Sequence, residues 1–302
     1  MANIKELRGR IKSIANIAKI TKAMEMVASM KLRKVQNRAL AIRPYTEELR
    51  GLLGHLASTV DGDEGSEKNM SLFLPRAEVK TVGVFLVTSD RGLCGSYNAN
   101  VLAQLHAYEK KVEAAGAKLK LYVYGKKGYT YLGRRGYDVE RYYADPPLDA
   151  LEFSAARIVG RDLVDDFRNG KIDAVQIAFT AFTSVARFEA RVDAFLPVSD
   201  ELVSDAIKQR DAKGSAGHNY LLEPNAEELL DRICERYLET VVFDAMLESL
   251  ASEMASRRMA MKGATDAASR MGRELKMAYN RARQESITKE LLDIIGGASA
   301  VS

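Results

Sequence analysis

Hydrophobic residues near the start of the chain recur with helical spacing. Twelve positions between residues 4 and 42 are separated by steps of three and four, and ten of the twelve are apolar. They are Ile4, Leu7, Ile11, Ile14, Ala18, Thr21, Glu25, Ala28, Leu32, Val35, Ala39 and Ile42. A stripe this narrow predicts the seam of a coiled coil. We expect Pro44 to kink or interrupt the helix, with residues 45–58 continuing it.

A second long helix is predicted at the other end of the chain. Asn225 precedes Glu228 by three residues, which is the spacing of a capping box. No proline follows before Gly296-Gly297, where we expect the helix to end. About 70 residues at 1.5 Å each span roughly 105 Å, too long for a compact domain of this size to bury. This helix therefore needs a partner along its length.

The apolar face of the second helix consists of small and flexible side chains. It comprises Leu247, Ala251, Met254, Met261, Ala264, Ala268, Met271, Leu275, Ala278 and Ala282. Nine of the 11 methionines lie on the two long helices. Methionine fills irregular cores, but it also suits a surface that meets several different environments, so two interpretations remain open.

The middle of the chain alternates between strand and helix patterns. Residues 81–89 form a nearly continuous apolar run, which is typical of a strand covered on both faces. Further strands are predicted at 118–125, 138–143, 171–182 and 187–198, and helices at 98–115, 126–134 and 153–167. The alternation predicts a mainly parallel sheet with right-handed crossovers, and the last two strands an antiparallel hairpin. Residues 60–68 and 199–220 are expected to be loops.

The predicted fold class is therefore α/β with two long helices at opposite chain ends. An antiparallel coiled coil, made of an N-terminal helix (1–58) and a C-terminal helix (221–296), projects from a central Rossmann-like domain (75–198) with a mainly parallel sheet.

Charge is distributed unevenly along this chain of 302 residues. The net charge is only +4, but residues 1–50 hold 12 Lys/Arg against 4 Asp/Glu, and the middle of the chain is acidic. Such asymmetry favours different partners for different parts. No apolar run of about 18 residues and no signal-peptide pattern occurs, so we expect a soluble cytosolic protein. Two distant cysteines and three histidines predict no metal site.

Candidate catalytic chemistry is sparse. The sequence has no phosphate-binding loop, no dinucleotide fingerprint and no hydrolase or metalloprotease motif. The best local candidate is the segment 89–96, SDRGLCGS, at the end of the first strand, where α/β folds usually bind ligands. Asp90 and Cys94 could serve an enzyme, but no histidine is near in sequence to activate the thiol. A structural turn or partner-docking loop is the favoured interpretation.

Basic stretches at 22–34 and 280–284 allow three interpretations. They could bind the phosphates of nucleic acid, meet acidic loops of a protein partner, or simply be solvated. No aromatic residue precedes Tyr45, so stacking with bases lacks support there. A nucleic-acid-binding basic coiled-coil protein therefore remains an alternative.

Three motifs together resemble the gamma subunit of the rotary ATP synthase. They are ITKAMEMVA (20–28), DRGLCG (90–95) and ARQESITKEL (282–291), in register along the whole chain. The resemblance implies a non-catalytic central shaft within a ring of three alpha and three beta subunits, with epsilon and the membrane c-ring at the α/β domain. The resemblance further implies that proton-driven rotation of the c-ring drives ATP synthesis, or that hydrolysis drives the reverse. It implies no cofactor, no metal, no nucleic acid, and membrane association only through the complex.

The resemblance also implies which residues contact the alpha/beta ring. They are Met24, Arg257, Gln284, Thr288 and Glu290. At about 100° per residue, Gln284 and Thr288 share one helix face while Glu290 lies about 200° from Thr288, so more than one subunit should contact them. Cys94 and Cys234 are singletons, unlike the cysteine pair of chloroplast members. A bacterial type at the cytoplasmic face of the cell membrane is therefore expected.

Overall fold

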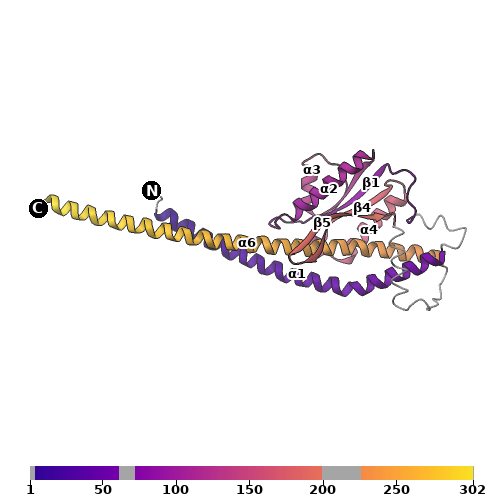
Figure 1. The fold of residues 1–302 in the computed structure, drawn as a ribbon, viewed down its shortest axis with the longest axis horizontal. Helices are drawn as coiled ribbons and strands as arrows, with labels where there is room; N and C mark the ends of the chain where they lie inside the picture. Colours follow the sequence, from indigo (N-terminus) through magenta and orange to yellow (C-terminus); the bar gives the residue numbers. More distant parts are fainter. Residues whose placement is uncertain (1–3, 61–71, 199–225, 302) are drawn as a thin grey trace. The chain divides into compact units, whose positions relative to one another are not determined.

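The computed structural model describes residues 4–60, 72–198 and 226–301 (Figure 1). The loops expected at 60–68 and 199–220 and the N-cap residue Asn225 fall wholly or almost wholly outside these ranges. Internal contacts divide the chain into two units. We call Met1–Met30 with Arg257–Ser302 the paired-helix unit, and Lys31–Ser256 the sheet unit.

Five strands form one sheet in the sheet unit. They are β1 (Thr81–Val87), β2 (Lys118–Tyr124), β3 (Val139–Tyr143), β4 (Ala174–Ser184) and β5 (Arg187–Leu196). Their order is β3-β2-β1-β4-β5, with β1 parallel to both β2 and β4, and β2 parallel to β3. Only β5 runs antiparallel, paired with β4. The predicted mainly parallel sheet and the terminal hairpin are confirmed.

Helices cover both faces of the sheet, which explains the nearly continuous apolar run of β1. Val84 and Leu86 belong to a core cluster with residues of α2 (Tyr97–Ala114) and α3 (Lys126–Gly133). Phe85 and Val87 point to the other face, in a cluster with α4 (Phe153–Arg168) and the two long helices (Figure 1). Alternate side chains of one strand are thus buried on opposite faces.

The two long helices are α1 (Ile4–Val60) and α6 (Ala226–Val301). Of the two outcomes expected at Pro44, interruption of the first helix is wrong, because α1 runs through it, and the expected continuation over residues 45–58 is confirmed. Pro44 is exposed, and the buried Leu49 and Leu53 hold the following turns against the core. The expected stop at Gly296-Gly297 is also wrong, since α6 continues to Val301. Glycine permits the left-handed conformation that ends a helix, but does not require it.

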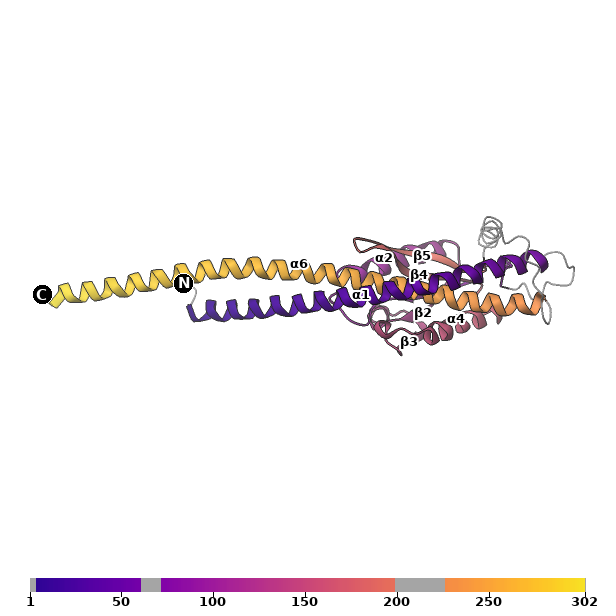
Figure 2. The same ribbon diagram turned by 90° about the horizontal axis from the view of Figure 1, so that it is seen from below.

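The paired-helix unit is an antiparallel coiled coil, as predicted (Figure 2). Thr21 Oγ1 lies 2.8 Å from Thr265 Oγ1, and a methyl group on Gly272 would lie 3.7 Å from Ile14 Cγ2. Residue numbers therefore rise on α1 as they fall on α6. In this register Ile4 lies opposite about residue 282.

Most of the predicted seam is confirmed, with three corrections. Eleven of the twelve α1 positions are buried or half-buried, whereas Ala39 is exposed. On α6 the predicted Met271 and Ala278 are exposed, and their neighbours Gly272 and Tyr279 face inward instead. The inward positions follow steps of four and three: Met261, Thr265, Ala268, Gly272, Leu275, Tyr279 and Ala282. The register of the two helices, rather than the apolarity of each residue, selects these positions; Gly272 faces inward because Ile14 of α1 lies opposite it.

Some methionines fill the core and others lie on the surface, so each of the two interpretations holds for part of the set. Met246, Met254 and Met261 are buried, whereas Met30 and Met277 are 65% and 66% exposed.

The division of the chain into segments 1–58, 75–198 and 221–296 stays a prediction.

The register of the paired helices makes a testable prediction. Ile14→Asp places a charge in the seam opposite Gly272 and should destabilise the pairing by about 1–3 kcal/mol. Ile17 is the matched control, because it lies one turn away on the same helix and is 47% exposed. Hydrogen exchange of backbone amides in residues 4–30 should accelerate in Ile14→Asp and not in Ile17→Asp. Equal protection in both variants would show that Ile14 does not face α6.

Candidate functional site

The turn after β1, residues 89–96, is held together by hydrogen bonds of its own side chains. Asp90 Oδ1 accepts the Lys126 amide at 3.0 Å, and its Oδ2 accepts the Leu148 amide at 2.8 Å. The carboxylate therefore joins the end of β1 to the start of α3 and to a short 3-10 helix (Leu148–Ala150). Both oxygens of the candidate catalytic acid are engaged in structure.

Cys94, the candidate nucleophile, is only 2% exposed. Its Sγ lies 3.3 Å from Asn98 Nδ2 and 3.6 Å from Ser89 Oγ, and Ser256 Oγ donates to its carbonyl at 2.6 Å. A thiol enclosed this way is shielded from substrate. The geometry supports the structural-turn interpretation of residues 89–96.

The role of Asp90 can be measured. Asp90→Ala leaves the Lys126 and Leu148 amides without their acceptors and should cost about 1–3 kcal/mol of unfolding free energy. Asp138→Ala removes an exposed carboxylate of the same unit and should change stability by less than about 0.5 kcal/mol. Denaturant unfolding of the two variants makes the comparison. Equal midpoints would contradict the structural role.

The five predicted contact residues all lie in the paired-helix unit but not at one site. Met24 and Arg257 are half-buried, whereas Gln284, Thr288 and Glu290 are exposed. Met24 lies opposite about residue 262, so about 33 Å of helix separates it from Gln284 at 1.5 Å per residue. Gln284 and Thr288 are one turn apart on α6. Glu290 lies about 200° around the helix from Thr288. Its carboxylate accepts a hydrogen bond from Ser286 Oγ at 3.4 Å.

The last part of α6 has no described α1 residue opposite it. We call residues 283–295 the C-terminal segment; they lie beyond the described start of α1 in both views (Figures 1 and 2). Except for the half-buried Ser286, every residue of this segment is exposed. Ile287, Leu291 and Ile294 follow helical spacing and are 48%, 54% and 67% exposed. An apolar stripe on a single helix indicates a surface that a partner covers.

The two units carry opposite charge. The paired-helix unit contains 15 Lys/Arg and 7 Asp/Glu, a surplus of +8, whereas the sheet unit contains 30 and 34, a surplus of −4. Ion pairs of the paired-helix unit include Arg10–Glu6 and Arg281–Glu285, which join neighbours on the same helix. The remaining positive charge gives the paired helices a field that attracts acidic surfaces.

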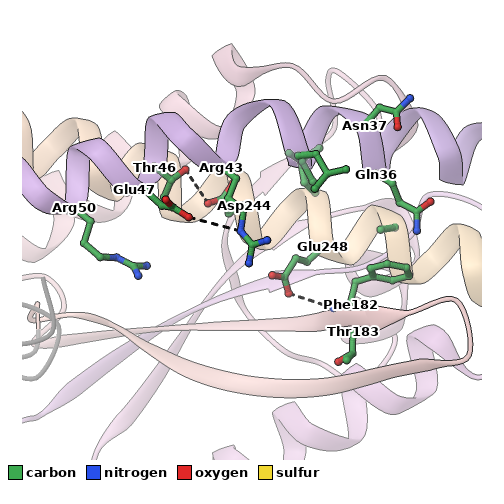
Figure 3. Close-up of a pocket in the computed structure, with 14 residues that line it drawn as sticks. Gln36, Asn37, Arg43, Thr46, Glu47, Arg50, Phe182, Thr183, Asp244 and Glu248 are labelled. Atoms are coloured by element: carbon green, nitrogen blue, oxygen red, sulfur yellow. Dashed lines mark hydrogen bonds and ion pairs between the residues drawn. The ribbon is translucent and has the colours of Figure 1, made fainter. Parts of the chain in front are cut away.

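The sheet unit also contains a groove between α1, α6 and the end of β4 (Figure 3). Its volume is about 870 Å³. Asp244 Oδ2 accepts from Thr46 Oγ1 at 3.4 Å, and Glu248 Oε2 accepts the Phe182 amide at 3.2 Å. Burial raises the pKa of Asp244 to about 6, and the nearby Glu248 adds to the rise, while Thr46 and Arg50 oppose it. Burial also raises the pKa of Glu248.

The raised pKa of Asp244 predicts a pH dependence of stability. A folded-state pKa above the unfolded value means that the folded protein binds a proton more tightly, so stability rises as pH falls from about 7 toward 4. Asp244→Asn should be more stable than the parent at pH 7.5 by about 1–3 kcal/mol, with the difference shrinking toward pH 4. Asp138→Asn serves as the exposed control. A difference that stayed constant with pH would contradict the assignment to Asp244.

Two of these features were not predicted, although the sequence contains signals for them. The apolar stripe of the C-terminal segment is visible as spacings of four and three from Ile287. Asp244 interrupts an apolar run from Val241 to Met246, which marks a buried carboxylate.

Comparison with known proteins decides the family. A family model described as ATP synthase matches residues 3–301. The gamma chain of ATP synthase from Acidovorax sp. (strain JS42) is 38% identical over 305 residues, and that from Methylobacillus flagellatus 39% over 306, each covering 100% of both chains. The chain belongs to the ATP synthase gamma family. None of these matches supports the nucleic-acid-binding alternative.

Solved structures agree with this family fold. A chain of the Euglena gracilis mitochondrial ATP synthase (OSCP/F1/c-ring) matches with a TM-score of 0.65 at 19% identity, covering 99% of this chain and 94% of that one. A chain of the Tetrahymena thermophila central stalk and c-ring matches with a TM-score of 0.57 at 22% identity, covering 81% and 99%. The expected fold class is confirmed. Among the described residues, no helix is long and apolar enough to cross a membrane.

Proposed function

We propose that this chain is the central rotor shaft of an ATP synthase. It transmits rotation of a proton-driven c-ring to a catalytic ring of three alpha and three beta subunits, or the reverse during ATP hydrolysis, and performs no catalysis itself. Family membership supports this role. Both candidate catalytic groups, Asp90 and Cys94, are engaged in holding a turn.

One structural observation carries the proposal: the C-terminal segment continues as a single helix with an exposed apolar stripe. Full burial of one leucine or isoleucine contributes about 1.5–3 kcal/mol, so Ile287, Leu291 and Ile294 represent a substantial association energy. Exposed residues occupy nearly every direction around this helix. A sleeve that surrounds the segment covers such a surface better than a flat partner on one side.

Rotation requires contacts that differ between angular states. A partner that bound every face equally tightly would leave the populations of the states unchanged. Methionines exposed on the paired helices, such as Met30 and Met277, adapt to different surroundings without locking one angle. The surplus of +8 on the paired-helix unit can favour particular angles against acidic loops.

The contact set Met24, Arg257, Gln284, Thr288 and Glu290 remains part of this proposal. Gln284 and Thr288 share a helix face and Glu290 points away from it, which suits contact with different subunits of the ring. Their exposed polar groups can form hydrogen bonds in one state and lose them in the next, each worth about 1 kcal/mol net.

The remaining partners and the location follow from the same role. The sheet unit is assigned to epsilon and the c-ring, and the named relatives are bacterial. We therefore place the chain at the cytoplasmic face of a bacterial cell membrane, attached only through the complex.

The contact residues provide the test. In the assembled complex, Gln284→Ala and Thr288→Ala should each lower steady-state ATP hydrolysis and synthesis several-fold, because one hydrogen bond of about 1 kcal/mol is lost in a subset of states. Assembly should be retained. Gln104→Ala, at an exposed glutamine on α2, is the matched control and should leave both rates unchanged.

Two results would count against the shaft. One is ATP turnover by the purified chain alone, which would make it an enzyme in its own right. The other is failure of the chain to co-purify with alpha and beta subunits, which would show that no alpha/beta ring surrounds the C-terminal segment.

A further inference from the structure

A second cavity of about 870 Å³ lies between α2 and α3 in the sheet unit. It opens at the carboxyl ends of β1 and β2, where parallel α/β sheets usually bind ligands. Four basic side chains from one short stretch line it, and we call them the cationic pocket: Lys126, Lys127, Arg134 and Arg135. The function proposed above makes no use of this cavity.

Helix geometry explains why these side chains converge. Lys127, Tyr131 and Arg134 are separated by four and three residues, so they lie on one face of α3 and its C-terminal turn. Ala99 and Leu102 of α2 form the apolar side of the cavity. Lys126 and Arg134 are eight residues apart, which places the charges over about 12 Å at 1.5 Å per residue.

The charges of the cationic pocket are not neutralised within the described part of the chain. None of its four side chains forms an ion pair there with a carboxylate; Arg135 instead stacks on the Tyr131 ring at 4.3 Å and lies 3.4 Å from His106 Nε2. The one acidic residue lining the cavity is Asp90, and both its oxygens already accept backbone amides. Arg91 also lines the cavity, so five cations surround one carboxylate, and their mutual repulsion is relieved when an anion enters.

The first turn of α3 directs recognition to the side chains. The Lys127 amide donates to the Ser89 carbonyl at 3.0 Å, and the Gly128 amide donates to Thr88 Oγ1 at 2.9 Å. With Asp90 accepting the Lys126 amide, the backbone donors that phosphates often use at helix starts are occupied. An anion in this cavity must therefore be held by lysine and arginine side chains.

We propose that the cationic pocket binds a multiply charged phosphate group, carried by a soluble polyphosphate compound or by an anionic lipid headgroup. Arginine guanidinium groups match phosphate oxygens in pairs, and lysine supplies compact positive charge. The cavity has the volume of a small-ligand site, and its cations span the length of a short phosphate chain. An acidic peptide would meet the same charge, but cations spread over only about 12 Å match a compact polyanion better than an extended chain.

Calorimetric titration of the purified full-length chain with inorganic pyrophosphate at low ionic strength tests the proposal. Saturable binding with one site is expected, weakening as salt is added. Lys127→Gln and Arg134→Gln should each reduce affinity about tenfold, the effect of losing one charge-assisted hydrogen bond. Lys110→Gln and Arg157→Gln remove exposed cations outside the cavity and should leave affinity unchanged.

Flotation with phosphatidylglycerol vesicles distinguishes the source of the phosphate. Binding of pyrophosphate without vesicles assigns the pocket to a soluble ligand, and variant-sensitive binding of vesicles assigns it to a lipid headgroup; either supports the proposal. Failure of both probes would overturn it. So would pyrophosphate or vesicle binding that the pocket variants and the control variants reduce equally, or a glutamate-rich peptide that binds where neither phosphate probe does.

Discussion

The antiparallel register of α1 and α6 is the constraint on which the paired-helix unit depends. Ile14 faces Gly272, and Thr21 shares a hydrogen bond with Thr265. At Ile14 a large side chain meets a glycine, so the two backbones can approach closely there. The threonine pair adds polar specificity, because shifting the register by one turn would leave these hydroxyls without each other. The same register leaves the C-terminal segment of α6 unopposed by described residues.

In the sheet unit the turn after β1, where α/β folds usually bind a ligand, has a structural role instead. Asp90 accepts amides from two following segments, so the carboxylate of the chain itself stands where a ligand anion often binds. Cys94 and Ser256 connect the same turn to α6. This arrangement fits a subunit that transmits force, since the turn after β1 is fixed to the long helix rather than free to close on a substrate. The basic side chains beside it remain available for a different anion.

Much of this architecture could be predicted from the sequence because its periodicities are strong. The continuous run of β1 and the steps of three and four in α1 identified a buried parallel sheet and a coiled-coil seam. The position of Tyr279 in the seam could not be read from apolarity, because register against Ile11 and Leu7 determines which α6 residues face inward. Helix ends were also poorly predicted, since Pro44 and Gly296 bias the backbone locally while packing and hydrogen bonding of neighbouring turns determine where a helix ends. The five contact residues, Met24, Arg257, Gln284, Thr288 and Glu290, were predicted from family resemblance alone, because a residue that contacts a partner has no spacing signal of its own.

Direct observation of rotation tests the central claim. A fluorescent probe attached through Lys110→Cys, an exposed site on α2, would report the orientation of this chain in an immobilised complex hydrolysing ATP. Both native cysteines are buried, so the introduced thiol is the accessible one. If the chain is the rotor shaft, the probe will rotate stepwise in one direction with three pauses per turn, one for each beta subunit. A probe that stayed fixed relative to the alpha/beta ring while ATP was hydrolysed at the normal rate would contradict it.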